Sequence, residues 1–266
     1  MTTLDYIPIP AFQDNYIWVV TDGRSAIVVD PGEAPPVHAY CRDHGLLITA
    51  ILLTHRHDDH VGGVAELLST GPVAENVTVY GPALELIDSV TVRVRQGGDI
   101  QIESPAFRAT VLDVPGHTAG HIAYYQPQHE DDAPHLFCGD TLFASGCGRL
   151  FEGTPAQMLS SLDVLAGLAE TTRVHCAHEY TVTNILFSRV CEPTNVDIEQ
   201  WLERAQAMRA AGEPTLPTTI GHEKAVNPFL RIDQLSIHDA LSSRFGLTES
   251  DRLATFTLLR RWKDEF

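Results

Sequence analysis

Residues 51–63, ILLTHRHDDHVGG, place three histidines and two aspartates within six positions, directly after an apolar run that is typical of a buried strand. His55 and His57 are two apart, so their rings share one side of an extended segment. Imidazole nitrogens and carboxylate oxygens together suit zinc, iron or manganese. This density of ligand types predicts a metal site, in which either Asp58 or Asp59 could supply the carboxylate.

Three further stretches repeat the pattern of an apolar run, a turn and then a potential ligand. They are VLDVPGHTAGH (111–121), HLFCGDTLF (135–143) and RVHCAHEYT (173–181). Each places a histidine or an aspartate where a strand is expected to end, and sites on α/β scaffolds commonly lie at such ends. Their order behind the histidine-rich stretch favours one shared metal centre.

The hydrophobic pattern changes along the chain. Short β-rich runs ending in Gly, Pro, Asp or His fill the first part, and the β signal fades near residue 180. Helical spacing predicts helices at 61–70, 154–169, 180–190, 196–211, 236–244 and 249–263. The last is expected to open on a capping box of Thr248 and Asp251. The pattern predicts a layered α/β domain over 1–178 and a helical domain over 179–266.

Composition excludes several classes of protein. The 266 residues are 44% hydrophobic and 20% charged, as in ordinary globular proteins. A net charge of −17 with only two lysines disfavours sequence-independent binding to nucleic acid. No apolar stretch approaches the roughly 20 residues of a membrane span. Five scattered cysteines without a CxxC pair, and no visible export signal, predict a protein of the reducing cytoplasm. A monomer is expected.

The motifs resemble those of a known superfamily. The stretch THRHDDH fits T-H-x-H-x-D-H, the signature of the metallo-β-lactamase superfamily. Further stretches resemble the hydroxyacylglutathione hydrolases (glyoxalase II) within it: IPAFQDNYIWVV, THRHDDHVGG, PGHTAGH, GDTLFASGCGRLFEG, HEYT, VNPFLR and LRRWKDEF. The resemblance spans nearly the whole chain. It implies a four-layered αβ/βα sandwich followed by a smaller all-helical C-terminal domain that binds glutathione.

The resemblance also implies a ligand set for two divalent ions, with zinc expected and iron or manganese as alternatives. One ion would be held by His55, His57 and His117, the other by Asp59, His60 and His178, with Asp140 bridging both. Asp58 falls on a variable position of the motif, and His121 is expected to be structural. The remaining histidines have no motif support: His38, His44, His129, His135, His175, His222 and His238.

The implied reaction is the hydrolysis of S-(2-hydroxyacyl)glutathione thioesters. S-D-lactoylglutathione would yield glutathione and D-lactate, the second step of methylglyoxal detoxification. Two metals about 3.5–4 Å apart can lower the pKa of a bound water from about 15.7 towards roughly 7. Asp59 and Asp140 would hold the ions that carry this hydroxide. A thiolate leaves readily, so no general acid on the protein is expected.

Basic residues near the C-terminus are candidates for binding the substrate. Arg260 and Lys263 are three apart and share a helical face. On charge alone, they could equally complement the helix dipole. The resemblance implies that they clamp the glycine carboxylate of glutathione, with Tyr180, Arg149 and Phe151 as further contacts. Some relatives carry lysine and tyrosine at the last two positions, so these two contacts depart from the family pattern. Asn227 of VNPFLR is expected to be structural.

Other activities of the superfamily remain alternatives. A persulfide dioxygenase would carry the same histidines but use a single iron, so metal stoichiometry separates it from the hydrolase. A dinuclear β-lactamase would usually carry cysteine in place of Asp140. A nuclease would need a basic face, and a non-catalytic binding module would show a broken ligand set.

Overall fold

The computed structural model describes residues 3–128, 132–248 and 251–266. Contacts divide the chain into two compact units. Unit 1 comprises Met1–Asp113 and Ala119–Gly139, and unit 2 comprises Val114–Thr118 and Asp140–Phe266. Among the described residues, none of the helices combines the length and apolar character needed to cross a bilayer.

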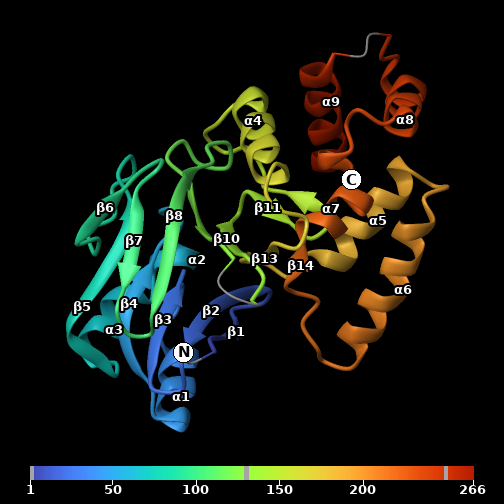
Figure 1. The fold of residues 1–266 in the computed structure, drawn as a ribbon. Helices are drawn as coiled ribbons and strands as arrows, with labels where there is room; N and C mark the ends of the chain where they lie inside the picture. Colours follow the sequence, from blue (N-terminus) through green and yellow to red (C-terminus); the bar gives the residue numbers. More distant parts are fainter. Residues whose placement is uncertain (1–2, 129–131, 249–250) are drawn as a thin grey trace. The chain divides into compact units, whose positions relative to one another are not determined.

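Unit 1 contains a mixed sheet whose strands follow one another in chain order (Figure 1). The first three strands pair antiparallel and the later ones pair parallel. The strands are β1 (Asp5–Ala11), β2 (Asn15–Thr21), β3 (Ser25–Val29), β4 (Leu47–Leu52), β5 (Val73–Pro82) and β6 (Val92–Val94). Parallel neighbours need crossovers. Helices supply two of them: α1 (Pro35–His44) precedes β4, and α2 (Asp58–Val61) with α3 (Val64–Thr70) precedes β5.

The core of this sheet explains why β2 and β3 are mainly apolar. Both β2 and β3 are buried along their whole length, which is typical of strands covered on both faces. The helix expected at 61–70 corresponds to α3, which begins three residues later, and α2 precedes it as a separate short helix. The break falls at two glycines: a Cβ on Gly63 would lie 2.4 Å from the Glu33 carbonyl carbon.

Unit 1 also contains antiparallel strands of a second sheet. These are β7 (Asp99–Ile102), β8 (Phe107–Asp113), β9 (Ile122–Gln126) and β10 (His135–Gly139). They connect to the first sheet where β4 ends. The buried Tyr124 hydroxyl donates to the Leu53 carbonyl at 2.7 Å, and the Ile122 amide donates to the Thr54 carbonyl at 3.0 Å. Hydrogen bonds from β9 therefore hold the residues that join β4 to the histidine-rich loop.

Unit 2 is mainly helical. A short hairpin is followed by helices and two further short strands: β11 (Leu142–Phe143), β12 (Gly146–Cys147), α4 (Pro155–Ala166), β13 (Arg173–Cys176), α5 (Thr181–Cys191), α6 (Val196–Ala210), β14 (Thr218–Thr219), α7 (Ile220–Val226), η1 (Pro228–Leu230), α8 (Leu235–Phe245) and α9 (Arg252–Glu265). The predicted helices at 154–169, 180–190, 196–211 and 236–244 correspond to α4, α5, α6 and α8. The sequence analysis missed α7.

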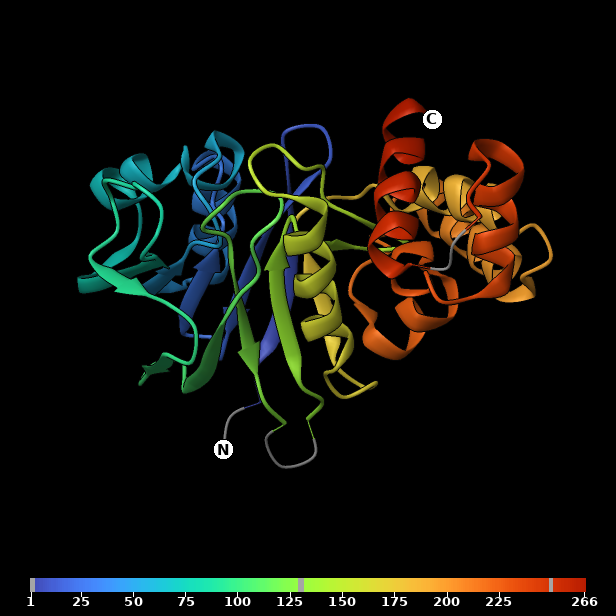
Figure 2. The same ribbon diagram turned by 90° about the horizontal axis from the view of Figure 1, so that it is seen from above.

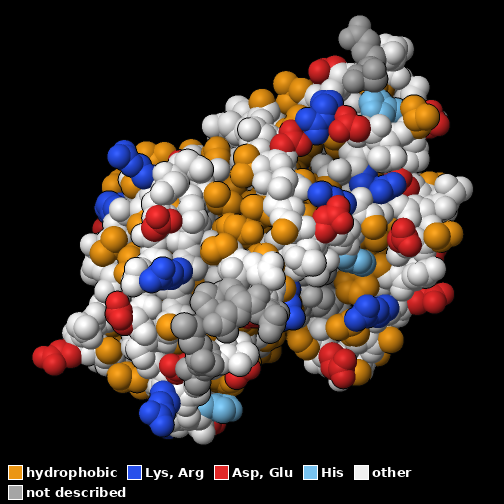
Figure 3. Space-filling view, viewed as in Figure 1, with side chains coloured by type: hydrophobic (Ala, Val, Ile, Leu, Met, Phe, Trp, Pro, Cys, Tyr) orange, Lys and Arg blue, Asp and Glu red, His pale blue; other side chains and the backbone are white. Residues whose placement is uncertain are grey.

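The last helix begins later than expected. The Asp251 carboxylate accepts from the Ala254 amide at 2.8 Å, so Asp251 is the N-cap and the capping box opening on Thr248 was wrong. The Arg252 guanidinium forms ion pairs with Asp163 on α4 at 2.8 Å and with Asp233 at 3.0 Å. Figure 2 shows α9 beside α4, and Figure 3 shows basic and acidic side chains adjacent near α8 and α9.

Candidate metal centre

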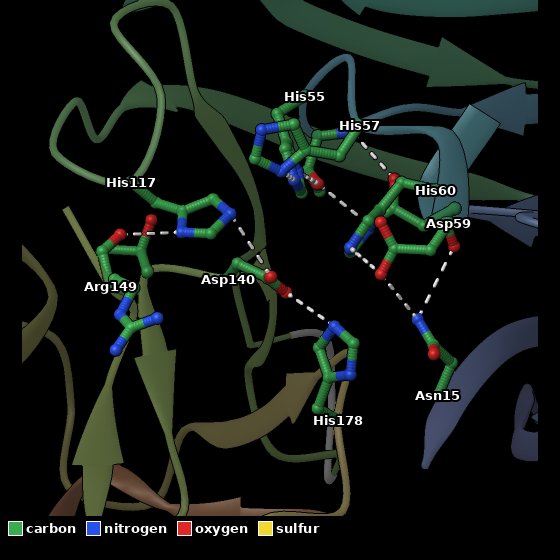
Figure 4. Close-up of polar contacts among 12 residues, drawn as sticks. Asn15, His55, His57, Asp59, His60, His117, Asp140, Arg149 and His178 are labelled. Atoms are coloured by element: carbon green, nitrogen blue, oxygen red, sulfur yellow. Dashed lines mark hydrogen bonds and ion pairs between the residues drawn. The ribbon is translucent and has the colours of Figure 1, made fainter. Parts of the chain in front are cut away.

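The loop that follows β4 brings four of the predicted ligands together within unit 1. His55 and His60 are buried, while His57 and Asp59 are partly exposed. His55 Nε2 lies 3.1 Å from His57 Nδ1, and His60 Nε2 lies 3.5 Å from Asp59 Oδ2 (Figure 4). The loop therefore presents two adjacent pairs of ligand atoms.

A buried carboxylate that the sequence analysis missed sets the tautomers of two of these histidines. Asp30 Oδ2 accepts from the Thr54 hydroxyl at 2.7 Å and from His60 Nδ1 at 3.1 Å. Because the Thr54 hydroxyl donates to Asp30, its oxygen accepts from His55 Nδ1 at 3.1 Å. Both rings therefore carry their proton on Nδ1 and their lone pair on Nε2, as metal ligands require. The only signal was the aspartate that ends the apolar run VVDPG.

Asn15 is a second residue that the sequence analysis did not single out. Its side-chain amide donates to Asp59 Oδ2 at 3.0 Å and to the Asp59 carbonyl at 3.5 Å. The Asp59 side chain is 41% exposed, and this amide helps to fix the direction of its carboxylate. A polar residue at the start of a strand that is otherwise apolar, QDNYIWVV, was the available signal.

Asp140, which directly follows β10, is the centre of the second ligand group, in unit 2. His117 Nε2 lies 3.3 Å from Asp140 Oδ2, and His178 Nε2 lies 3.4 Å from Asp140 Oδ1. Figure 4 shows the two rings at opposite ends of the carboxylate. His117 Nδ1 donates to the Arg149 carbonyl at 2.8 Å, which places its lone pair on Nε2. One histidine on each oxygen is the arrangement expected of a carboxylate that bridges two cations.

The donor geometry fits a metal ion in both units. Ligands at 2.0–2.2 Å from a tetrahedral zinc ion lie about 3.3–3.6 Å from each other. The neighbouring donor atoms described above are 3.1, 3.3, 3.4 and 3.5 Å apart. All seven predicted ligands fall within the groups of histidine and aspartate residues that could hold metal. The residues present therefore fit the metal chemistry that the sequence predicts.

Two predicted substrate contacts lie against these ligands. The Tyr180 ring stacks on His178, with centroids 4.7 Å apart and planes 6° apart. The Phe151 ring is edge-on to His117 at 5.2 Å, and Phe151 is 62% exposed. Aromatic surface therefore borders the Asp140 group on both of its histidines.

Two of the three predicted basic contacts, Arg149 and Arg260, meet at one acidic residue. Asp264 Oδ1 accepts from Arg149 Nε at 3.3 Å and from Arg260 Nη2 at 3.1 Å. Arg260 is buried, and its Nη1 donates to the Cys147 carbonyl at 2.9 Å. The Lys263 ammonium lies 5.3 Å from the centre of the Phe187 ring, and burial, with the nearby Arg260 charge, lowers the pKa of Lys263 to about 8.

Some of the other histidines pack against neighbouring rings in the described part of the chain. His121 stacks on His55 at 4.5 Å, as expected for a structural residue beside the ligands. His135 stacks on Tyr6 at 3.6 Å, and His44 Nδ1 lies 2.9 Å from the Tyr40 carbonyl. His129 lies outside the described residues.

Comparisons with known proteins agree with this fold. The model of the metallo-β-lactamase superfamily matches residues 11–178, and the model of the hydroxyacylglutathione hydrolase C-terminus matches residues 179–266. The predicted fold class is thus confirmed: a metallo-β-lactamase-like sandwich followed by a smaller, mainly helical C-terminal region, in which β14 is the short exception.

Individual relatives narrow the assignment. Hydroxyacylglutathione hydrolase of Cupriavidus taiwanensis is 55% identical over 262 residues, covering 97% of this chain and 98% of that protein. A protein crystallised in a di-iron-bound form is 27% identical, with a TM-score of 0.57 over 85% of this chain and 100% of that one. ETHE1 from Myxococcus xanthus, 21% identical with a TM-score of 0.62 over 98% of this chain and 99% of that one, shares the fold. The chain belongs to the hydroxyacylglutathione hydrolase family, and it is a thioester hydrolase.

Proposed function

We propose that this enzyme hydrolyses S-D-lactoylglutathione to glutathione and D-lactate with two divalent metal ions. The observation that carries the proposal is Asp140, whose two oxygens each face a different histidine. His55, His57 and His117 would hold one ion, Asp59, His60 and His178 the other, and Asp140 both. Zinc is proposed because an all-nitrogen and oxygen donor set suits it, and the relative with two irons supports a dinuclear site.

The chemistry divides between the ions and the chain. When bound, the two ions supply an activated water and a Lewis acid for the thioester carbonyl. The chain orients the histidine ligands of the ions. Asp30 keeps the proton of His60 on Nδ1, and the Arg149 carbonyl keeps the proton of His117 on Nδ1. Asp59 and Asp140 are the proposed catalytic carboxylates because they fix where the ions sit. The thiolate of glutathione is a good leaving group, so no protein acid is assigned.

The glutathione moiety is proposed to contact Tyr180, Phe151 and the basic residues of unit 2. Tyr180 and Phe151 border the metal-binding histidines. With a pKa of about 8, Lys263 is a cation at neutral pH and can attract a glycine carboxylate. Arg260 and Arg149 belong to the same proposed clamp, although Asp264 and the Cys147 carbonyl already engage them.

The domain roles and the cellular context are part of the proposal. We propose a catalytic domain over 1–178 and a glutathione-binding domain over 179–266, a division supported by the two family matches. A role in methylglyoxal detoxification follows from the proposed substrate. A cytoplasmic monomer without nucleic-acid or membrane partners remains our proposal, supported by the acidic charge and by five buried, unbridged cysteines.

A thiol-release assay tests the proposed substrate. S-D-lactoylglutathione is compared with a small uncharged thioester, with oxygen consumption recorded in parallel on glutathione persulfide. Rapid thiol release from the glutathione ester, slower release from the small ester and no oxygen uptake are expected. Oxygen uptake with one iron per chain would favour the persulfide dioxygenase. Equal rates on both esters would contradict recognition of glutathione.

A further inference from the structure

The turn between β11 and β12, residues 143–147, lies three residues beyond Asp140. Most of its backbone carbonyls accept hydrogen bonds from side chains that belong to the helical region after residue 178. Asn227 Nδ2 donates to the Phe143 carbonyl at 3.2 Å and to the Gly146 carbonyl at 2.9 Å. Asn184 Nδ2, from α5, donates to the Ala144 carbonyl at 3.1 Å.

The middle and end of the same turn are held in the same way. The Ser145 amide donates to Glu223 Oε2 of α7 at 2.7 Å, and the Ser188 hydroxyl donates to the Ser145 carbonyl at 3.3 Å. Arg260 Nη1 donates to the Cys147 carbonyl at 2.9 Å. The five side chains are buried, each with at most 6% of the residue exposed: Asn184, Ser188, Glu223, Asn227 and Arg260. We call this set the turn clamp.

The turn adopts a conformation that these contacts must maintain. Ser145 has a φ of +57°, in the left-handed region that disfavours residues with a side chain. A Cβ on Gly146 would lie 2.5 Å from Asn184 Nδ2, so the clamp fits against bare backbone. Asn227 also donates to Glu223 Oε2 at 2.9 Å, and its Oδ1 accepts from the Phe229 amide at 3.1 Å. Asn227 and Glu223 therefore act as one oriented unit.

The turn is in contact with the backbone of Asp140. The Gly148 amide donates to the Thr141 carbonyl at 3.2 Å, and Leu142 pairs with Cys147. A Cβ on Gly148 would lie 1.9 Å from the Asp140 carbonyl oxygen. A shift of the hairpin would therefore displace the Asp140 backbone and the carboxylate attached to it.

We propose that Glu223 and Asn227 are positioning residues for Asp140, acting through the turn, so that the helical region maintains metal affinity as well as binding substrate. The inference rests on the proposed dimetal function. Glu223 is suited to the role because its Oε2 accepts from both the Ser145 amide and the Asn227 side-chain amide. Burial raises its pKa to about 7, and the Ser145 and Asn227 hydrogen bonds oppose that shift.

The turn clamp gives Arg260 a second role besides its proposed contact with substrate. Its guanidinium donates to the turn and to Asp264, so loss of Arg260 should weaken metal binding besides any effect on substrate. Lys263, whose ammonium lies over the Phe187 ring, is therefore the cleaner probe of substrate binding.

The test measures zinc affinity of the apoprotein by competition with a chromophoric chelator. The variants are Glu223→Ala, Glu223→Gln and Asn227→Ala. The control Asn195→Ala removes an asparagine of the same region that donates to the Ala225 carbonyl at 3.0 Å and does not touch the turn. Glu223→Ala and Asn227→Ala should weaken zinc binding about 10–100-fold, as loss of supporting contacts commonly does. Glu223→Gln, which keeps an acceptor for Ser145, should recover most of the affinity.

Asn195→Ala should lower the melting temperature and leave zinc affinity within twofold of wild type. Folded Glu223→Ala and Asn227→Ala proteins with wild-type affinity would overturn the inference. If those two variants fail to fold, Ser188→Ala serves instead, because it removes one hydrogen bond of the turn clamp with little change in volume. Weaker zinc binding in Ser188→Ala than in Asn195→Ala supports the inference, and equal zinc binding overturns it. Failure of the proposed function would look different, as wild type itself would bind fewer than two ions.

Discussion

The two ligand groups are built in opposite ways. In unit 1, four ligands are almost consecutive in sequence, and a single buried carboxylate, Asp30, orients His60 directly and His55 through the Thr54 hydroxyl. In unit 2, three ligands are scattered over about sixty residues, and Asp140 depends on a turn held by helices far along the chain. Ligands that are close in sequence thus need one supporting side chain to orient them. Ligands that are far apart in sequence need contacts between distant parts of the chain.

The largest effect is expected at the centre of the dispersed group. Asp140→Ala removes the carboxylate that faces both His117 and His178, so neither ion keeps its full ligand set. We expect loss of both metals and a fall in kcat/KM of more than about 10³-fold. Metal analysis beside thiol release measures both. Asp58→Ala, at the position assigned no ligand role, is the control and should retain both ions. Two metals in Asp140→Ala would remove its bridging role.

A smaller effect is expected at the single support of the local group. Asp30→Asn puts an amide donor where Oδ2 accepts from Thr54 and His60, so His60 must move its proton to Nε2. Zinc affinity should fall about 10–100-fold. Asp99→Asn changes an exposed aspartate of the same unit that accepts from Thr110, and it should have no effect. Wild-type affinity in Asp30→Asn would show that the tautomer is set elsewhere.

The support of Asp59 should matter less, because only one hydrogen bond to its carboxylate is lost. Asn15→Ala removes the amide 3.0 Å from Asp59 Oδ2. We expect about tenfold weaker binding of one of the two ions and little change in the other. Stepwise zinc titration by calorimetry separates the two events. Equal weakening of both would mean that Asn15 supports the fold rather than Asp59.

The smallest effect is expected at the substrate clamp. Lys263→Ala should raise KM for S-D-lactoylglutathione about five- to tenfold, the range of a partly solvated charged contact, and leave kcat nearly unchanged. Because the pKa of Lys263 is about 8, its charge is present below that pH, and wild-type KM should rise as pH passes through 8. Lys263→Arg stays charged and should lose this pH dependence. If KM and its dependence on pH were unchanged in Lys263→Ala, Lys263 would only complement the helix dipole.

The lysine also predicts the pH dependence of stability. Its pKa falls from 10.5 to about 8 on folding, so the unfolded chain binds more protons between these values. The free energy of unfolding should therefore rise as pH increases from about 8 to 10.5. Lys263→Met should flatten that rise in denaturant titrations at pH 8 and 10. An equal slope in both proteins would show that other groups cause it.

The sequence predicted the parts of the molecule that are encoded locally. Apolar runs gave the main strands, the ligand motif gave the loop after β4, and the family resemblance gave the fold class and the activity. The break between α2 and α3 was missed because it depends on close packing around Gly63 rather than on hydrophobic period. Asp30, Asn15 and Glu223 were missed because their roles depend on partners up to 78 residues away.

The most direct test of the account is the number of ions needed for hydrolysis. Apoprotein is titrated with zinc while bound metal and thiol release from S-D-lactoylglutathione are followed together. The account predicts that activity rises with bound metal, that binding ends at two ions per chain, and that Asp140→Ala reaches neither end point. Full activity of the metal-free, folded protein, or full activity that persists in Asp140→Ala, would contradict it.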